Sequence, residues 1–538
     1  MRPRAGGAGE RTLVVVVAAA AAVLLRLPWW RADLEGLVRG VVPDDAFYYF
    51  QLARRLWAGQ GLSFDGATLA SGVHPLWLGL LVPLFRSAEP GSAAPVRLAL
   101  AAGSGLALAA TLQLERLARR LTGRVVVSLP LALAFGANLW VVRESLNGLE
   151  TALTLALGAA LLSAGAGALE QPSARAGWRF GLLGAASIWA RSDSALIVAC
   201  LGLAVLLVAR PRGTALAGLA GPPAAAVAAL VAATAALTGH PLQSSATAVP
   251  WLVHANWHRA HPGAGSWEAH RHGLELLEGS LLGSRDLLGP AASLVLLVSL
   301  LAAGALLLLA RGRLSRATRA AAIVLGSLLL GLACLHAVHG YLRWYPRSWY
   351  FVGWALAAYV AAALAAAGLG EAMARSGWRG AAAWATSGLL LACCGLEHLR
   401  TWRLIGQPQF PWQAEMLAAG RGLAALVPPD QVVGSFNAAI IAYATPRTVV
   451  NLDGVVNEEA ASALREGRLG RYLRERRVRY LVDYPVMWSD APYLHAAGPY
   501  LGPEFVAASR QTLARFDVPG VGWPSPDQAV TLIRIAWP

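Results

Sequence analysis

Long apolar segments, separated by short loops that carry arginine, fill the chain from its N-terminus to about residue 396. An α-helix needs about 20 mainly apolar residues to cross a bilayer, and most of these segments approach that length. The sequence therefore predicts a polytopic α-helical membrane protein with about eleven or twelve spans. The segments lie at about 12–30, 74–86, 94–114, 124–141, 148–166, 179–191, 194–210, 214–237, 288–310, 319–337, 348–368 and 379–396.

Composition and charge support the same class. Only 14% of the 538 residues are charged, whereas soluble globular domains carry about a quarter. The net charge of +15 comes from arginine alone, because the chain has no lysine. These arginines punctuate the apolar segments and form no basic face, so they indicate membrane topology and not nucleic-acid binding. The predicted partner is a lipid bilayer, and the alanine- and glycine-rich composition is typical of a GC-rich bacterial genome.

The arginines also predict an orientation. They precede the first span and cluster around 116–124, 175–179, 210–212, 311–319 and 375–379. The positive-inside rule places all of them in the cytoplasm only if one early segment does not cross. Segment 74–86 is the shortest candidate and is predicted to be re-entrant or interfacial; alternatively it crosses and a neighbouring segment is broken.

If one early segment does not cross, the loops on the other side of the membrane are extracytoplasmic, and we expect this membrane to be a bacterial plasma membrane. These loops are 31–75, 142–150, 238–287 and 338–347. The tail, 397–538, lies on the same side and is predicted to be a soluble α/β domain attached to the membrane module 1–396. Its predicted helices lie at 412–426, 437–443, 457–466 and 470–477, and its predicted strands at 431–434, 447–451, 478–482 and 529–535.

Residues 43–57 contain the most informative pattern. Their spacing predicts an amphipathic helix that lies in the membrane interface, with Asp44 and Asp45 at its N-terminus. Aspartates at that position cap helices and interact favourably with the helix dipole. A carboxylate at the mouth of an intramembrane cavity can also take a proton from an acceptor hydroxyl. Both interpretations of the aspartates stay open.

These residues and several later motifs resemble the GT-C glycosyltransferases, multi-span enzymes that take sugars from polyprenyl-phosphate donors. The resemblance is closest to bacterial members similar to the cell-wall arabinofuranosyltransferases, and more distant to protein mannosyltransferases and lipid A aminoarabinose transferases. It implies that Asp44 is the general base and that Glu150 is a second acidic residue of the site. The matching residues are Asp44-Asp45-Ala46-Phe47-Tyr48-Tyr49, Leu52-Ala53-Arg54, Gly59-Gln60-Gly61, Phe64-Asp65-Gly66, Ser71-Gly72-Val73-His74-Pro75-Leu76-Trp77, Asn147-Gly148-Leu149-Glu150-Thr151, Ala190-Arg191-Ser192-Asp193 and Asn451-Leu452-Asp453-Gly454-Val455-Val456-Asn457.

Further candidate residues lie at the same predicted rim of the membrane. Glu150 comes shortly after Arg143 in the sequence. Either these two residues form an ion pair, or Glu150 acts together with the aspartates. Two carboxylates in one pocket suit base catalysis or a Mg²⁺ or Mn²⁺ ion held against a phosphate. No metal ligands are assigned. The remaining candidates for donor or acceptor binding are His74, Arg191, Asp193, Tyr341, Arg343, Arg347, Asn451 and Asp453.

Each of these candidates also has a simpler interpretation. Arg191 and Asp193 can form a local ion pair, and residues 341–350 can be an aromatic membrane anchor. Arg343 or Arg347 can instead bind a donor phosphate through its guanidinium group. The histidine- and tryptophan-rich loop 238–287 is expected to shape an acceptor groove, and the Gly434-Ser435 turn can bind an anion at a helix N-terminus.

Together these features predict an inverting glycosyltransferase. It would move a sugar from a polyprenyl-phosphate donor to a hydroxyl of a glycan, lipid or protein acceptor on the extracytoplasmic face. The alternative is a transporter or flippase of a lipid-linked sugar, which predicts charged residues deep within the spans and paired broken helices. A structural membrane scaffold is the third possibility, and it predicts no convergence of Asp44 and Glu150.

Overall fold

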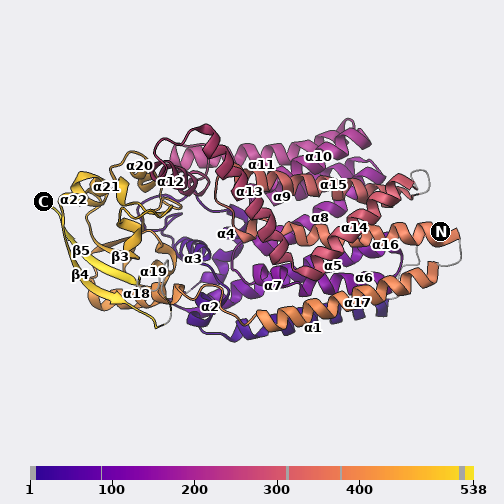
Figure 1. Ribbon diagram of the computed structural model, residues 1–538, viewed down its shortest axis with the longest axis horizontal. Coiled ribbons are helices and arrows are strands. Elements are labelled where there is room, and N and C mark those ends of the chain that lie inside the picture. Colours follow the sequence, from indigo (N-terminus) through magenta and orange to yellow (C-terminus); the bar gives the residue numbers. More distant parts are fainter. Residues whose placement is uncertain (1–7, 87, 310–313, 376–378, 520, 522–527) are drawn as a thin grey trace.

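The computed structural model describes residues 8–86, 88–309, 314–375, 379–519, 521 and 528–538. A bundle of helices occupies one end of the elongated molecule, and a small domain with a β-sheet occupies the other (Figure 1). The N- and C-termini lie at opposite ends. Shorter helices of the first loop and of the 244–288 region lie between the bundle and the domain.

Twelve helices form the bundle within the described residues. Six of them are long and apolar enough to cross a membrane, or up to eight if each of two bent helix pairs counts as one span. Two more, of 17 and 16 residues, lie among them. The polytopic class is confirmed, and the total of eleven or twelve spans stays a prediction. The bundle helices are α1 (Ala8–Arg31), α5 (Ala93–Thr122), α6 (Val125–Ala137), α7 (Leu139–Ser145), α8 (Thr151–Glu170), α9 (Ala174–Ala190), α10 (Ser194–Ala209), α11 (Thr214–Thr238), α14 (Pro290–Leu309), α15 (Arg316–His336), α16 (Gly353–Ala372) and α17 (Arg379–Leu404).

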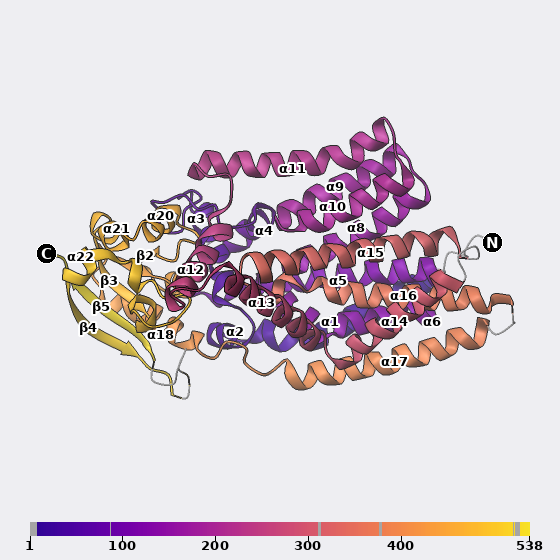
Figure 2. The ribbon, with the colours of Figure 1, turned by 45° about the horizontal axis from the view of Figure 1, so that its top comes forward.

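The arginine-bearing loops gather at the bundle end that is remote from the β-sheet domain (Figure 2). Arg120 in the last turn of α5 donates to Glu170, the last residue of α8, at 2.7 Å. Arg316 reaches the carbonyl of the same Glu170, and the backbone N–H of Ser315 donates to Glu371 at 2.9 Å. The loops after α5, α8, α14 and α16 therefore lie at the same end of the bundle, as the predicted orientation requires. Residues 1–7 and 310–313, which hold the predicted cytoplasmic residues Arg2, Arg4, Arg311 and Arg313, lie outside the described residues.

Segment 74–86 forms the short helix α4 (Pro75–Leu81) and the 3₁₀ turn η1 (Val82–Phe85). At about 1.5 Å per residue, such a segment is too short to cross a hydrocarbon core of about 30 Å. Phe85 stacks on Phe50 of the first loop at 5.0 Å. The segment thus packs beneath the first loop, which agrees with the prediction that it does not span.

The first loop contains α2 (Leu34–Gly40) and the predicted helix 44–57, observed as α3 (Asp44–Trp57). The expectation that α3 lies in the lipid interface is wrong. Its residues 46–53 are all buried in protein. Phe47 and Phe50 meet Tyr443 of the β-sheet domain, with ring centroids 5.2 and 6.3 Å apart. The tail supplies the apolar cover that lipid was expected to provide.

The C-terminal domain is a five-stranded mixed sheet of order β2-β1-β3-β5-β4. Strand β1 pairs in parallel with both β2 and β3, whereas β5 pairs antiparallel with both β3 and β4. All eight predicted elements are present, and the predicted module boundary at 396/397 falls inside α17. The elements are α18 (Gln413–Leu426), β1 (Val432–Ser435), α19 (Ala438–Ala444), β2 (Thr448–Asn451), α20 (Glu458–Arg465), α21 (Leu469–Glu475), β3 (Val478–Asp483), α22 (Gly502–Ala507), β4 (Ser509–Phe516) and β5 (Val530–Ala536).

Between the bundle and this domain lie α12 (Ser244–Ala260) and α13 (Ser266–Leu288), which meets α14 at a bend of 108°. After α15, the chain continues as a π-helical turn η2 (Ala337–Leu342) and a 3₁₀ turn η3 (Ser348–Tyr350). These segments bring residues far apart in the sequence to the same end of the bundle.

Candidate functional site

A cavity of about 440 Å³ lies between the bundle and the C-terminal domain. Its wall combines the start of α3, the residues before α4 and α8, the turn after α9, helix α12, the segment before α16, and three parts of the C-terminal domain. Asp44 and Glu150 line this one cavity, so the two predicted acidic residues converge. The predicted site residues in its wall are Asp44, Asp45, His74, Glu150, Arg191, Arg347 and Asp453.

Asp44 links the first loop to the C-terminal domain. Its Oδ1 accepts the backbone N–H of Ile440 at 2.7 Å, in the first turn of α19. Its own backbone N–H donates to Gln413 Oε1 at 2.6 Å. Burial raises the pKa of Asp44 well above its usual value, the Ile440 N–H opposes this, and the neighbouring Asp45 adds to it. One carboxylate oxygen is thus fixed by a helix N-terminus, which orients the side chain at the cavity wall.

Asp45 and Arg347 both line the cavity and influence each other's charge. Burial raises the pKa of Asp45, and Arg347 opposes that rise. Burial also works against the charge of Arg347, but Tyr345 and Asp45 outweigh it and hold the pKa of the guanidinium above its usual value. Arg347 lies 4.2 Å from the ring centroid of Tyr345 and donates to its hydroxyl. Its Nε has no hydrogen-bond partner among the described residues.

Glu150 and Arg191 meet on the bundle side of the cavity. Arg191 Nη1 donates to Glu150 Oε1 at 2.9 Å, and its Nε donates to Asp193 Oδ1 at 2.8 Å. His339 holds the other oxygen of Asp193 at 2.8 Å. The positive charge of Arg191 is thus matched by two carboxylates. Glu150 is 3% exposed, and its Oε2 has no hydrogen-bond partner within the described chain. The carboxylate also lies close to the hydroxyl of Tyr49, another residue of the cavity wall.

His74 completes this side of the wall. Its Nε2 lies 3.7 Å from Glu150 Oε1, and its Nδ1 is 3.4 Å from the backbone N–H of Ser192. Burial lowers the pKa of His74, and the nearby Glu150 opposes that shift. A neutral imidazole that accepts at Nδ1 presents its Nε2–H toward the carboxylate.

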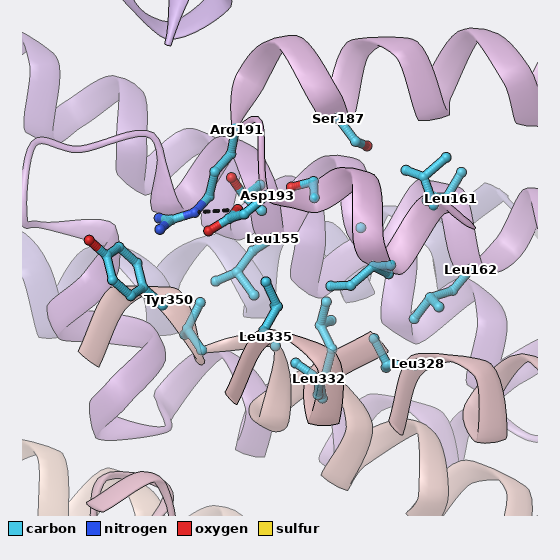
Figure 3. A pocket seen from close by; sticks show the side chains of 18 of the residues that line it. Leu155, Leu161, Leu162, Ser187, Arg191, Asp193, Leu328, Leu332, Leu335 and Tyr350 are labelled. Carbon is cyan, nitrogen blue, oxygen red and sulfur yellow. Dashed lines mark hydrogen bonds and ion pairs between the residues drawn. The ribbon is translucent and has the colours of Figure 1, made fainter. Parts of the chain in front are cut away.

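A narrow apolar slot of about 50 Å³ begins where the polar cavity ends. The two share Arg191, Trp349 and Tyr350. Figure 3 shows Arg191 and Tyr350 at one end of the slot, with leucine side chains from α8 and α15 along it. The polar cavity therefore continues into an apolar space between membrane helices. The leucines labelled there are Leu155, Leu161, Leu162, Leu328, Leu332 and Leu335.

Asp193 lines that slot, and the remaining four predicted residues lie outside both spaces. Arg143 donates to the carbonyl of Leu404 at 2.9 Å, and Tyr341 bonds His270 at 2.7 Å. Arg343 donates to the carbonyl of Ser245 at 3.1 Å. Asn451 is fully buried and donates to the hydroxyl of Tyr48 at 3.0 Å.

The predicted anion site at the Gly434-Ser435 turn is occupied by the chain itself. Asp483 at the end of β3 accepts the backbone N–H groups of Phe436 and Asn437 at 2.8 and 2.7 Å and the Ser435 hydroxyl at 2.9 Å. A helix N-terminus attracts a carboxylate as readily as a phosphate. The prediction of an external anion at this turn is therefore wrong.

Asp453 enters the cavity from the C-terminal domain. Its Oδ1 accepts the backbone N–H of Val455 at 2.9 Å, and its Oδ2 lies 3.5 Å from the hydroxyl of Tyr48. Burial raises the pKa of Asp453 to about 7, because the hydrogen bonds with the Val455 backbone and the Asn451 side chain offset only part of the lost hydration.

The cavity also has aromatic residues that the sequence analysis did not assign to it. Tyr48 and Tyr49 stand inside the first motif, so that motif was a signal for them. Tyr493 and His495 come from an irregular loop after β3, and no sequence pattern marked them. The full set of unassigned aromatic and histidine residues is Tyr48, Tyr49, Tyr345, Trp349, Tyr350, Phe410, Trp412, Tyr493 and His495.

The residues of loop 238–287 contribute a wall and not a metal centre. Ser245, Val249 and Leu252 of α12 line the cavity. In the described part of the chain, no three His, Cys, Asp or Glu side chains come together as a metal site. His254 of this loop is stacked face to face on Trp344 at 3.7 Å.

Comparison with known proteins identifies solved structures with a similar fold. A family described as a domain of unknown function, DUF8728, matches residues 405–530. A search of curated protein sequences finds no match. The crystal structure of ArnT from Cupriavidus metallidurans bound to undecaprenyl phosphate is similar over 98% of both chains, with 13% identity and a TM-score of 0.56. The archaeal oligosaccharyltransferase AglB from Archaeoglobus fulgidus, in complex with an inhibitory peptide and a dolichol-phosphate, is similar over 91% of this chain and 71% of its own, with 15% identity and a TM-score of 0.55.

At these identities the likeness establishes the fold alone. The chain has the fold of the GT-C glycosyltransferases, a multi-pass membrane module followed by a smaller domain. The predicted fold class is confirmed. The predicted relation to one bacterial branch of these enzymes stays a prediction.

Proposed function

We propose that this protein is a glycosyltransferase that moves a sugar from a polyprenyl-phosphate donor to an acceptor hydroxyl. The observation that carries the proposal is the junction at Arg191, Trp349 and Tyr350. There a polar cavity with four carboxylates opens into a slot lined by leucines between membrane helices. A polyprenyl phosphate sugar has the matching parts, with an apolar chain on one side and a phosphate and a polar sugar on the other. ArnT is similar in fold, and its crystal structure is bound to undecaprenyl phosphate.

Arg347 is the best candidate to bind the donor phosphate. Of the two arginines predicted for this role, Arg343 lies outside the cavity. Arg191, a third arginine nearby, is already matched by Glu150 and Asp193. Arg347 lines the cavity, and its Nε has no hydrogen-bond partner among the described residues. A guanidinium group donates to phosphate through parallel N–H bonds, and Asp45 nearby supports its charge.

Asp44 is the proposed general base. It would take the proton of the acceptor hydroxyl as that oxygen attacks the anomeric carbon of the donor sugar. The bond between this carbon and the phosphate oxygen breaks, and its electron pair leaves with the phosphate. The products are the glycosylated acceptor, with inverted configuration at the anomeric carbon, and the polyprenyl phosphate. Arg347 stabilises the negative charge that develops on the leaving phosphate.

Glu150 is proposed to bind the transferred sugar. Arg191 and His74 hold its Oε1, while the buried Oε2 has no hydrogen-bond partner among the residues that the structure describes. A sugar hydroxyl that donates to this oxygen would remove the cost of a buried unsatisfied acceptor. Asp45 and Glu150 also offer carboxylate oxygens to Mg²⁺ or Mn²⁺, but the described donor set falls short of three protein ligands. No step of the proposed reaction is assigned to a metal.

The reaction is proposed to occur on the extracytoplasmic face of a bacterial plasma membrane. The cavity and the C-terminal domain lie at one end of the bundle, and the loops that carry Arg120 and Arg316 lie at the other. The positive-inside rule assigns the arginine-rich end to the cytoplasm.

Transfer by the purified protein tests this function. The protein in lipid nanodiscs is given radiolabelled polyprenyl-phosphate sugars and an acceptor extract of cell-envelope glycans, lipids and proteins. We expect the label to leave the lipid fraction and appear in one acceptor fraction with the wild type, and to stay in the lipid with Asp44→Asn. Lipid-linked sugar that crosses the bilayer without transfer would instead support the transporter alternative.

A further inference from the structure

The chain enters the cavity through an unusual backbone turn at Trp344. Its φ angle is +52°, in the left-handed region that bulky residues rarely adopt. Such a conformation is costly for a bulky residue and persists only where the surroundings impose it. Because Trp344 stands three residues before Arg347, its conformation sets the path of the chain to the guanidinium group.

The backbone before Trp344 is also irregular. Helix α15 ends in the π-helical turn η2, in which the N–H of Arg343 bonds the carbonyl of Val338 at 2.9 Å. The N–H of Tyr345 then returns to the carbonyl of His339, also at 2.9 Å. Single π-helical turns are frequent at functional sites. Here the turn ends the membrane helix and directs the next residues sideways.

Three side chains enclose the ring of Trp344, which is 7% exposed; we call them the aromatic cage. His254 of α12 stacks on the ring with centroids 3.7 Å apart and planes 10° apart. Trp257 of α12 meets it edge-on at 5.3 Å, and His272 of α13 does so at 4.8 Å. His254 Nε2 also lies 3.2 Å from the carbonyl of Leu342.

A glycine of α13 makes this enclosure possible. A Cβ atom at Gly273 would lie 3.1 Å from Trp344 Nε1 and 2.8 Å from the ring of Tyr341. Any side chain there would push α13 away from the turn. The aromatic cage therefore depends on close packing of both α12 and α13 against Trp344.

Beyond Trp344 the chain has little freedom. Tyr345 precedes Pro346, which restricts it to extended conformations. Tyr345 and Arg347 both reach the cavity wall and contact each other there. We infer that the aromatic cage holds Trp344 in its left-handed conformation and that Trp344 is a positioning residue for Arg347. This inference rests on the proposed role of Arg347 in binding the donor phosphate.

A double-mutant cycle with undecaprenyl phosphate as the probe tests the inference. Trp344→Gly removes the ring and leaves a residue that takes positive φ at little cost, so it separates the cage contact from backbone strain. We expect Arg347→Gln to weaken binding to the protein in nanodiscs about 10-fold, as for loss of one charged hydrogen bond. Trp344→Gly should weaken binding of undecaprenyl phosphate by a similar factor. When Trp344→Gly is added to Arg347→Gln, binding should weaken further by less than about 2-fold.

Two further variants guard against a general loss of structure. Trp344→Phe keeps a ring for His254 to stack on and should bind nearly as the wild type does. Trp537→Ala removes an indole that donates to the carbonyl of Val478 at 2.9 Å in the C-terminal sheet. Its effect on binding, if any, should be independent of Arg347→Gln.

The outcomes distinguish the two proposals. If the wild type fails to bind undecaprenyl phosphate, the proposed function is overturned and the inference falls with it. If the wild type binds and Arg347→Gln weakens binding, but Trp344→Gly has no effect or multiplies with Arg347→Gln, the positioning role alone is overturned.

Discussion

Replacement of Asp44 gives the sharpest test of the proposed chemistry, because its two oxygens have different tasks. Oδ1 accepts the N–H of Ile440, while the rest of the carboxylate faces the cavity. Asp44→Asn keeps an amide oxygen for that N–H and removes the base. Asp44→Ala removes both. The two variants therefore separate catalysis from the link between the first loop and α19.

The expected magnitudes follow from those contacts. Loss of a general base typically costs about 10²–10⁴ in rate, so Asp44→Asn should lower kcat by that factor and leave thermal stability within about 0.5 kcal/mol. Asp44→Ala leaves a buried N–H without an acceptor and should cost a further 1–3 kcal/mol, roughly, in unfolding free energy. Asp45→Asn is the matched control, since Asp45 bonds no backbone group in the described chain.

The assay measures sugar transfer and thermal unfolding of the same preparations over a range of pH. A base works only when ionised, so the wild-type rate should rise with pH through the raised pKa of Asp44. Asp44→Asn should lose this rise. If folded Asp44→Asn retains more than about a tenth of the activity, or if Asp45→Asn alone abolishes the pH-dependent rise, the assignment of Asp44 as base is refuted.

Three further perturbations probe other parts of the site. Arg347→Lys keeps the charge but loses the planar guanidinium, and kcat should fall by about 10-fold or more in a transfer assay. Leu332→Trp fills the apolar slot, so KM should rise for a long polyprenyl donor and much less for a donor with two isoprene units. Asp453 has a folded pKa of about 7, above its unfolded value, so the stability it contributes is complete below about pH 4 and is lost as pH rises through 7. Asp453→Asn should flatten that decline in unfolding temperature between about pH 4 and pH 7.

Much of the fold followed from periodicity and charge. The apolar segments marked the bundle helices, and the loop arginines placed Asp44 and Glu150 on one side. Helix α3 was predicted because its apolar residues recur at helical spacing. Its location was not predicted, because an apolar face does not reveal whether lipid or protein covers it. Strand β4 was missed because most of its residues are exposed, so it shows no alternation of apolar and polar residues.

The candidate site was predicted less completely. Sequence motifs contain residues that contact each other within one loop, as do Tyr49 and His74, and they also contain buried turn residues such as Asn451. The choice among arginines depended on partners in other helices. Arg191 is matched by Glu150, which is 41 positions away, whereas the Nε of Arg347 has no partner in the part of the chain that the structure describes. The conformation of Trp344 depends on α12 and α13, and no local pattern predicts a left-handed tryptophan.

The aromatic contacts between α3 and Tyr443 have a consequence for how this chain can be divided. Phe47, Phe50 and Phe85 belong to the same hydrophobic core as the interior of the C-terminal sheet. The tail is therefore not an interchangeable module. Removing it would leave the start of the first loop without its apolar cover, and exchanging it for the tail of a related protein requires exchanging residues 34–85 as well.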